Sequence, residues 1–271
     1  MGYEKEKIEE MIKQGRDFVR GVEVDESYLT DQELHLPQPP LAKAPMGGER
    51  FKLPVDFENL SIKNDFLEII NSRKSNRVYT QEGISLLELS YLLWCTQGVK
   101  EIRGKAYATL RTVPSGGARH PFECYMVIQN VEGLEPGLYH YLPMKHELER
   151  IGELQNFISE SLYGQKWASK ADVVFYYSFV GYRAEWRYGI YAHRVVLIDA
   201  GHVTENLYLA CTSLGLGTCA VGALDGKIAD QVFGLDGEEE YIFYAQPVGT
   251  IREKDVQKEK EHYRFVEEEG Y

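Results

Sequence analysis

The feature that most constrains the fold is a long helical segment in the second half of the chain, predicted from about Trp186 to Leu214. Its second half, VVLIDAGHVTENLYLACTSL, is apolar on most faces, with Gly201 and His202 as small and polar interruptions. A helix that is apolar almost all round is buried, either in a large core or against another subunit. The segment therefore predicts a fold organised around one central helix, and the subunit alternative fits a dimer.

Helices and strands alternate irregularly around this segment. Ser85 and Glu88 fit a capping box, which predicts a helix over 86–97 that ends at Gly98. Residues 122–128 and 137–142 favour strands on either side of a turn, as in an antiparallel pair. After the long helix, the pattern predicts a strand over 219–224, a short helix over 226–233 and a final strand over 241–249. The expected class is a mixed α+β fold.

The N-terminal part differs from the rest in composition. Residues 3–20 have apolar side chains at helical spacing and a charged opposite face, which predicts an amphipathic helix. Residues 34–54 are rich in proline, with Pro39 and Pro40 adjacent, so regular structure is not expected there. We therefore divide the chain into an N-terminal helix and extended arm (residues 1–59) and a main domain (residues 60–271).

Composition narrows the classes of function. The 42 acidic and 30 basic residues give a net charge of -12, which disfavours a nucleic-acid partner. Apolar runs long enough for a signal peptide or a membrane span are not found. The four cysteines are far apart and without a C-x-x-C pair, and the histidine spacing does not favour a metal site. We expect free thiols in a reducing cytoplasm, no metal and no membrane association.

Two stretches carry candidate binding chemistry. Arg73, Lys74, Ser75 and Arg77 follow a short apolar helix, and such a group can hold a phosphate, although a basic helix C-terminus is also favourable without a ligand. In the stretch VPSGGARHP (113–121), two glycines allow close approach to a flat ligand, and a tight turn into the next strand is the alternative interpretation.

Taken in order, several stretches resemble the nitroreductase-like flavoprotein superfamily and specifically its SagB-type dehydrogenase branch. They cover roughly residues 65–250 and include RKSNRVY (73–79), RTVPSGGARHPFECYMVI (111–128), GQKWASKADVVF (164–175) and WRYGIYAHRVVLIDAGHVTENLYLACTSLGLGT (186–218). The resemblance implies an α+β sandwich with a central, mostly antiparallel sheet and long helices that join two protomers. It also implies flavin mononucleotide (FMN) at each of two subunit interfaces of a homodimer.

The resemblance assigns roles residue by residue. The basic segment Arg73, Lys74, Ser75 and Arg77 matches the part that holds the flavin phosphate and ribityl chain. Pro114, Ser115 and Gly116 match the loop that lies against the flavin ring from the other subunit. Gln165 is similar to a glutamine at the pyrimidine edge, and Gly222 and Ala223 match a turn that approaches the ring. Arg252 and Arg264 are alternative candidates for a further phosphate-binding cation.

The catalytic position carries a substitution. SagB-type dehydrogenases use a Lys-Tyr pair to handle a proton while flavin accepts a hydride, and here the matching pair is Arg187 and Tyr188. A guanidinium stays charged and is a poor general base, so Tyr188 is the candidate proton-handling residue. Arg187 could hold an anionic substrate or stabilise a reduced flavin, and an ordinary salt-bridging role on a helix is the alternative.

The leading hypothesis is an FMN-dependent oxidoreductase that transfers a hydride between bound flavin and a small-molecule or peptide substrate. The G-x-G-x-x-G pattern does not occur, so NAD(P)H would act as a transient donor without a site of its own. The alternative is a non-catalytic protein of the same fold that binds a peptide or acts as a scaffold in a peptide-modification system, with the proline-rich arm as its recognition segment.

Overall fold

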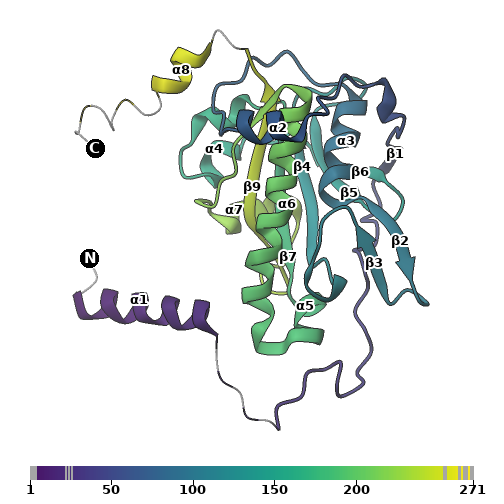
Figure 1. Ribbon diagram of the computed structural model, residues 1–271, viewed down its shortest axis with the longest axis vertical. Coiled ribbons are helices and arrows are strands. Elements are labelled where there is room, and N and C mark those ends of the chain that lie inside the picture. The colour runs from purple at the N-terminus through teal and green to yellow at the C-terminus, as the bar shows by residue number, and fades with distance from the viewer. Residues whose placement is uncertain are drawn as a thin grey trace.

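The computed structural model describes residues 5–21, 23, 25, 27–252, 255–261, 264 and 268. A seven-stranded sheet forms its centre, in the order β1-β6-β5-β4-β7-β9-β8, with every neighbouring pair antiparallel (Figure 1). The strands are β1 (Glu49–Lys52), β4 (Phe122–Ile128), β5 (Gly137–Leu142), β6 (Glu147–Glu153), β7 (Val173–Val180), β8 (Leu216–Thr218) and β9 (Glu240–Thr250). The predicted α+β class with a mostly antiparallel sheet is confirmed.

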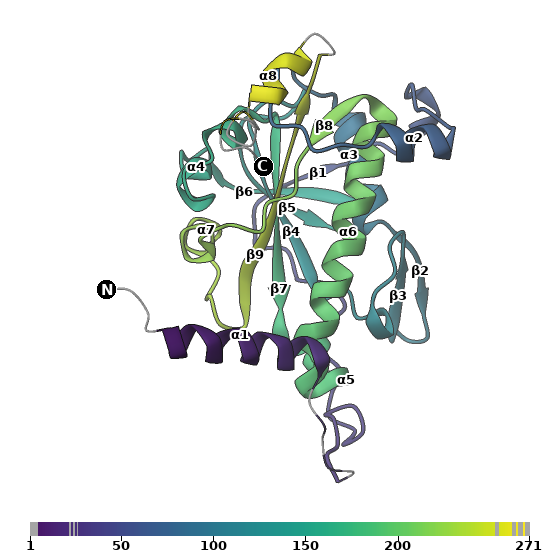
Figure 2. The same ribbon diagram turned by 60° about the vertical axis from the view of Figure 1, so that its left-hand side comes forward.

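Helices cover both faces of this sheet (Figure 2). On one face, α3 (Leu86–Gln97) and α6 (Ala192–Leu214) pack over the apolar side chains of β4 and β7. On the other face lie α4 (Ile158–Ser161), the 3-10 helix η3 (Lys166–Lys170) and α7 (Gly226–Phe233). Strand β4 lies between these two layers of helices and is buried along its whole length. Such two-sided cover explains why the central strands have nearly continuous apolar sequences.

The remaining elements lie around this body. A separate hairpin consists of β2 (Val99–Arg103) and β3 (Ala108–Arg111). Helix α1 (Lys5–Arg20) has no buried residue and stands to one side in Figure 1, with Arg194 Nη1 donating to the carbonyl of its last residue, Arg20. The other helices are α2 (Phe66–Ser72), α5 (Gly181–Tyr188) and α8 (Val256–Glu261), with 3-10 turns η1 (Phe57–Asn59), η2 (Gly116–Ala118) and η4 (Gly189–Tyr191).

Predictions that rest on local interactions are confirmed. The capping box of α3 is present, with Glu88 N donating to Ser85 Oγ at 3.2 Å and Ser85 N donating to Glu88 Oε2 at 2.7 Å. The strands over 122–128 and 137–142 pair antiparallel as predicted. The helix over 226–233 is present, and the final strand extends the predicted 241–249 by one residue at each end. The N-terminal helix is described from residue 5; the predicted residues 3 and 4 lie outside the described residues.

Three boundary predictions are wrong. The long helix does not run unbroken from Trp186, because Gly189 adopts φ 48° and ψ -127°, and α6 begins only at Ala192. Residues 219–224 are not a strand; the strand that follows α6 is β8, which ends at Thr218, and Val221 makes only an isolated bridge to Ala245. The proline-rich arm contains regular structure after all, since β1 pairs with β6 at the sheet edge.

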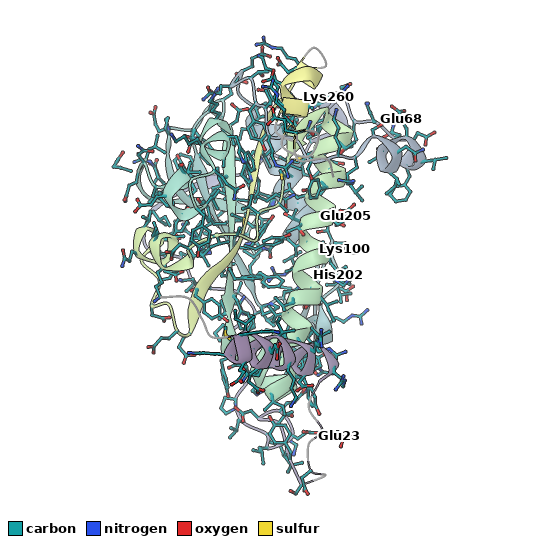
Figure 3. The ribbon with its side chains drawn as sticks, turned by 90° about the vertical axis from the view of Figure 1, so that its left-hand side faces the viewer. Glu23, Glu68, Lys100, His202, Glu205 and Lys260 are labelled. Carbon is teal, nitrogen blue, oxygen red and sulfur yellow. The ribbon has the colours of Figure 1, made fainter. Side chains whose placement is uncertain are left out.

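Only one face of α6 is buried within the chain. Val196, Val203 and Leu207 face the core, whereas Leu197 and Ile198 are each 55% exposed. Further along the helix, His202 and Glu205 are also exposed (Figure 3). The sequence correctly predicted an apolar helix against the core. The other face, which carries these apolar and polar side chains, is not covered by the residues that the structure describes.

Buried charges attach the arm to the sheet. Glu123 accepts from Arg183 Nη2 at 2.6 Å and from the backbone N–H of Lys43 at 2.7 Å, and its other oxygen lies 3.3 Å from His140 Nε2. Burial alone would raise the pKa of Glu123, but Arg183 and His140 bring it well below the ordinary value. Glu149 accepts from the backbone N–H groups of residues 46, 47 and 48 in the same way.

Removing one partner of a buried ion pair leaves an uncompensated charge, which costs about 3–5 kcal/mol. We therefore expect Glu123→Ala to lower the free energy of unfolding by about that amount, measured by urea denaturation at pH 7. Glu101→Ala, at a side chain 58% exposed, is the matched control and should change it by less than about 1 kcal/mol. Equal stability of the two variants would show that the Glu123 network does not hold the fold.

Candidate functional site

The basic segment crosses the C-terminal half of α6. Arg73 caps α2, and its guanidinium carbon lies 5.3 Å from the ring centroid of Tyr208. Ser75 Oγ is 3.0 Å from the hydroxyl of Tyr208, which also accepts from the backbone N–H of Ala220 at 2.8 Å. Tyr208 therefore joins the basic segment to the residues that follow β8.

Two consecutive backbone amides in this segment already hold an anion. The N–H groups of Arg77 and Val78 donate to one oxygen of Glu259, at 2.7 and 2.6 Å. The other oxygen of Glu259 is buried without a hydrogen-bond partner among the described residues. Adjacent amides that converge on one oxyanion are a common way to bind phosphate. The carboxylate of Glu259 in α8 thus lies where a phosphate oxygen would fit, in a cavity that Lys74 also lines.

The other predicted residues, Gln165, Gly222 and Ala223, lie near the basic segment or near α4. Gln165 precedes η3, whose Trp167 ring lies 5.8 Å from the Arg77 guanidinium. The turn with Gly222 and Ala223 is held beside α4, because the backbone N–H of residue 225 donates to the carbonyl of residue 161 at 2.7 Å. A Cβ on Gly222 would have only one neighbour within 4 Å, at 3.7 Å, so its backbone is open to a ligand.

The two C-terminal cations differ in their surroundings. Arg252 pairs with Glu82 and lines, together with Lys74, a cavity of about 310 Å³. Arg264 Nη2 lies 4.0 Å from Glu261 Oε1, within the C-terminal segment. Of the two candidates named from the sequence, Arg252 is therefore the one placed near Lys74.

The loop of residues 114–117, called the PSGG loop below, is held by a buried carboxylate, Asp199, which was not predicted from the sequence. Ser115 Oγ donates to Asp199 Oδ2 at 2.7 Å, and Gly116 N donates to the same oxygen at 3.0 Å. Burial raises the pKa of the Asp199 carboxyl, and these hydrogen bonds oppose the rise. Ser115 Oγ also accepts from His120 N at 2.9 Å, whereas Pro114 is exposed. A lone acid in the apolar run VVLIDAG was the signal that could have predicted this contact.

Arg187 and Tyr188 lie directly against this loop. A Cβ on Gly117 would come within 2.3 Å of Arg187 Nε and 2.9 Å of the Tyr188 hydroxyl, so only glycine fits there. Gly117 also has φ 55°, in the left-handed region that favours glycine. Arg187 Nη1 donates to Gln32 Oε1 at 2.9 Å and to the Tyr107 hydroxyl at 3.0 Å. The arm thus contributes a residue, Gln32, that sequence reasoning did not find.

The two parts of the site are separated along α6 within one protomer. Asp199 holds the PSGG loop and Tyr208 holds the basic segment, nine residues further on. At 1.5 Å per residue this corresponds to about 13.5 Å along the helix axis. The structure therefore brings the predicted residues together as two groups, one near each half of α6, and not as one pocket.

Comparison with known proteins decides the family. The model of the Nitroreductase family matches residues 70–250. A Methanocaldococcus jannaschii protein assigned by name to the nitroreductases is 33% identical over 196 residues, which span 72% of this chain and 93% of that protein. The chain belongs to the nitroreductase family. A nitroreductase structure from Ralstonia eutropha JMP134 superposes with a TM-score of 0.63 at 26% identity, over 80% of this chain and 95% of that one.

Two further proteins that this chain resembles are named as processing proteins. The trifolitoxin-processing protein TfxB of Rhizobium leguminosarum bv. trifolii is 34% identical over 46% of this chain and 36% of its own length. The microcin B17-processing protein McbC of Escherichia coli is 28% identical over 39% of this chain and 42% of its own length. These matches confirm the resemblance to the SagB-type branch and cover less than half of either relative.

Metal and membrane features can be stated for the described part of the chain. Within it, no group of three or more His, Cys, Asp or Glu side chains is placed to hold a metal ion. No helix in that part is both long enough and apolar enough to span a membrane.

Proposed function

We propose that this nitroreductase-family protein is an FMN-dependent oxidoreductase that transfers a hydride between bound flavin and an organic substrate. The observation that carries the proposal is the pair of amides at Arg77 and Val78, which hold a carboxylate in a cavity that Lys74 also lines. This donor set fits a phosphate monoester, because backbone N–H groups and cations together bind oxyanions strongly. The flavin, when bound, would supply the redox chemistry, and the chain would supply position and charge.

The proposed site is completed by a second protomer. The basic segment, Gln165, Gly222 and Ala223 would hold one flavin, and the loop of Pro114, Ser115 and Gly116 would come from the partner. The separation of about 13.5 Å along α6 supports this arrangement. The uncovered face of α6, with Leu197 and Ile198 exposed, offers apolar surface for a homodimer interface.

Arg187 and Tyr188 are the proposed catalytic residues at the loop. The Arg187 guanidinium carbon lies 5.8 Å from the Tyr188 ring centroid. Partial burial would lower the pKa of Arg187, but hydrogen bonding to Tyr188 and Tyr107 leaves it raised, so Arg187 stays charged. We assign proton transfer to the Tyr188 hydroxyl and stabilisation of negative charge to Arg187.

The proposed substrates follow from flavin chemistry and from the proteins that this chain resembles. A nicotinamide such as NAD(P)H is the proposed transient donor for reduction of nitro or quinone-like compounds. Oxidation of a modified peptide is the second candidate, and the similarity to TfxB and McbC favours it. Arg187 occupies the position of the lysine in SagB-type dehydrogenases. Because a guanidinium is a poor general base, Arg187 is not expected to abstract a proton as that lysine would.

The phosphate assignment predicts weaker flavin binding when a cation is removed. We expect Arg73→Ala and Arg77→Ala each to lose about 1.5–3 kcal/mol of FMN affinity, the usual contribution of a charged hydrogen bond. The measurement is a titration of flavin fluorescence against apoprotein. Arg103→Ala, on the exposed hairpin, is the control and should bind FMN like the parent. Unchanged affinity in both test variants would exclude this segment as the phosphate site.

Removing the charge of Glu259 should strengthen FMN binding. A phosphate at the amides of Arg77 and Val78 must displace its carboxylate, so Glu259→Gln removes a competing charge. We expect this variant to bind FMN at least about threefold more tightly than the parent in the same titration. Glu101→Gln, at an exposed side chain of the β2–β3 hairpin, is the control. Weaker binding by Glu259→Gln would mean that the carboxylate supports the flavin site and does not compete for it.

Tyr188 is tested separately from flavin binding. Tyr188→Phe keeps the ring and removes the hydroxyl, so we expect turnover to fall by a factor of about 10² or more while FMN affinity is unchanged. Turnover is followed by NADH oxidation with a quinone acceptor. Tyr163→Phe, at an exposed tyrosine, is the matched control. Full turnover by Tyr188→Phe would remove this hydroxyl from the mechanism.

A further inference from the structure

A large cavity lies between the proline-rich arm and the main domain, away from the basic segment. Its volume is about 800 Å³, and its walls are residues 38–43 and 45, Arg50, residues 105–107 of the β2–β3 turn and residues 142–145 of the β5–β6 turn. We call it the arm cavity. This size is within the range of pockets that bind small organic molecules.

The walls of the arm cavity are held in place by polar contacts. Gln38 Nε2 donates to the carbonyl of Ala106 at 3.2 Å, which joins the arm to the hairpin turn. Arg111 Nη2 donates to the carbonyl of Leu41 at 3.1 Å. Lys43 Nζ donates to the Tyr125 hydroxyl at 2.7 Å. Because these contacts hold the arm against the hairpin and the sheet, the space is preformed.

The charged side chains that line the arm cavity are all cations. Four cations line the cavity, Lys43, Arg50, Lys105 and Lys145, and no carboxylate does. Lys43 pairs with Glu240 at 2.5 Å, and Arg50 lies 3.7 Å from Glu147. Lys105 and Lys145 are exposed and have no ion-pair partner in the part of the chain that the structure describes. In a chain of net charge -12, such a group of cations favours a negatively charged ligand.

Much of the remaining lining of the arm cavity is apolar. The side chains of Pro39, Pro40, Leu41, Pro143 and Met144 all border the cavity. Prolines have no backbone N–H, so the arm offers few donors there and suits an apolar group. We propose that the arm cavity binds a small amphiphilic carboxylate, with its hydrocarbon part against these side chains and its carboxylate at Lys105 and Lys145.

Tyr107 connects this cavity to the proposed catalytic pair. Its side chain borders the cavity, and its hydroxyl accepts from Arg187 Nη1 at 3.0 Å and from Gln32 Nε2 at 3.1 Å. A ligand that moves Tyr107 would therefore act on the position of Arg187. Binding itself depends only on the cavity and needs no flavin, so it can be tested apart from the proposed redox function.

The test compares two ligands of equal chain length by isothermal titration calorimetry of the full chain. Decanoate should bind with a 1:1 stoichiometry, and decyltrimethylammonium should bind at least tenfold more weakly, although the net charge of the protein favours the cation. The double variant Lys105→Glu/Lys145→Glu should weaken decanoate binding at least tenfold. Lys100→Glu, at an exposed lysine of β2 outside the cavity, should bind decanoate like the parent (Figure 3).

The length of the ligand's hydrocarbon chain tests the apolar part of the cavity. Octanoate should bind on the order of tenfold more weakly than decanoate, since each buried methylene contributes about fourfold in affinity. Equal binding of the carboxylate and the ammonium, or decanoate affinity unchanged in the double variant, would overturn the proposal. Binding of an acidic, apolar peptide without binding of decanoate would also overturn it, because the occupant would then be a peptide. Retained thermal stability of the double variant shows that it folds.

Discussion

The packing of α6 across the sheet is the constraint on which the rest of the site depends. One face of the helix contributes Val196, Val203 and Leu207 to the core. Residues just beside that face, Asp199 and Tyr208, hold the PSGG loop and the basic segment. Because the buried face of α6 is closely packed against the sheet, these two contacts fix the spacing of the two groups. The geometry of the proposed flavin site is therefore a consequence of core packing.

The arm depends on a different interaction, the burial of charge at the sheet. Glu123, Glu149 and Glu240 all accept hydrogen bonds from residues of the arm. Buried carboxylates that accept from backbone N–H groups give directional attachment, which apolar contact alone does not. This attachment explains how a proline-rich segment can have a defined course. It also places Gln32 beside Arg187 and forms one wall of the arm cavity.

The sequence predicted elements whose signals are local and missed contacts between distant residues. The capping box of Ser85 and Glu88 joins residues three apart, and it was readable from the sequence. The contacts of Asp199 with Ser115, of Tyr208 with Ser75 and of Glu259 with Arg77 span 84, 133 and 182 residues. The break at Gly189 was missed because its φ depends on tertiary context. Family membership was predicted from ordered motifs, while the roles of the individual site residues stay predictions.

The central claim, that the chain binds FMN, is tested most directly by the visible absorption spectrum of the purified protein, with heat release and mass measurement of any chromophore. We expect a yellow protein that releases FMN at about one per chain. A colourless protein that also fails to take up added FMN would contradict the account. The basic segment would then be only a charged helix end. The protein would fit the alternative hypothesis, a non-catalytic binding or scaffold protein of this fold.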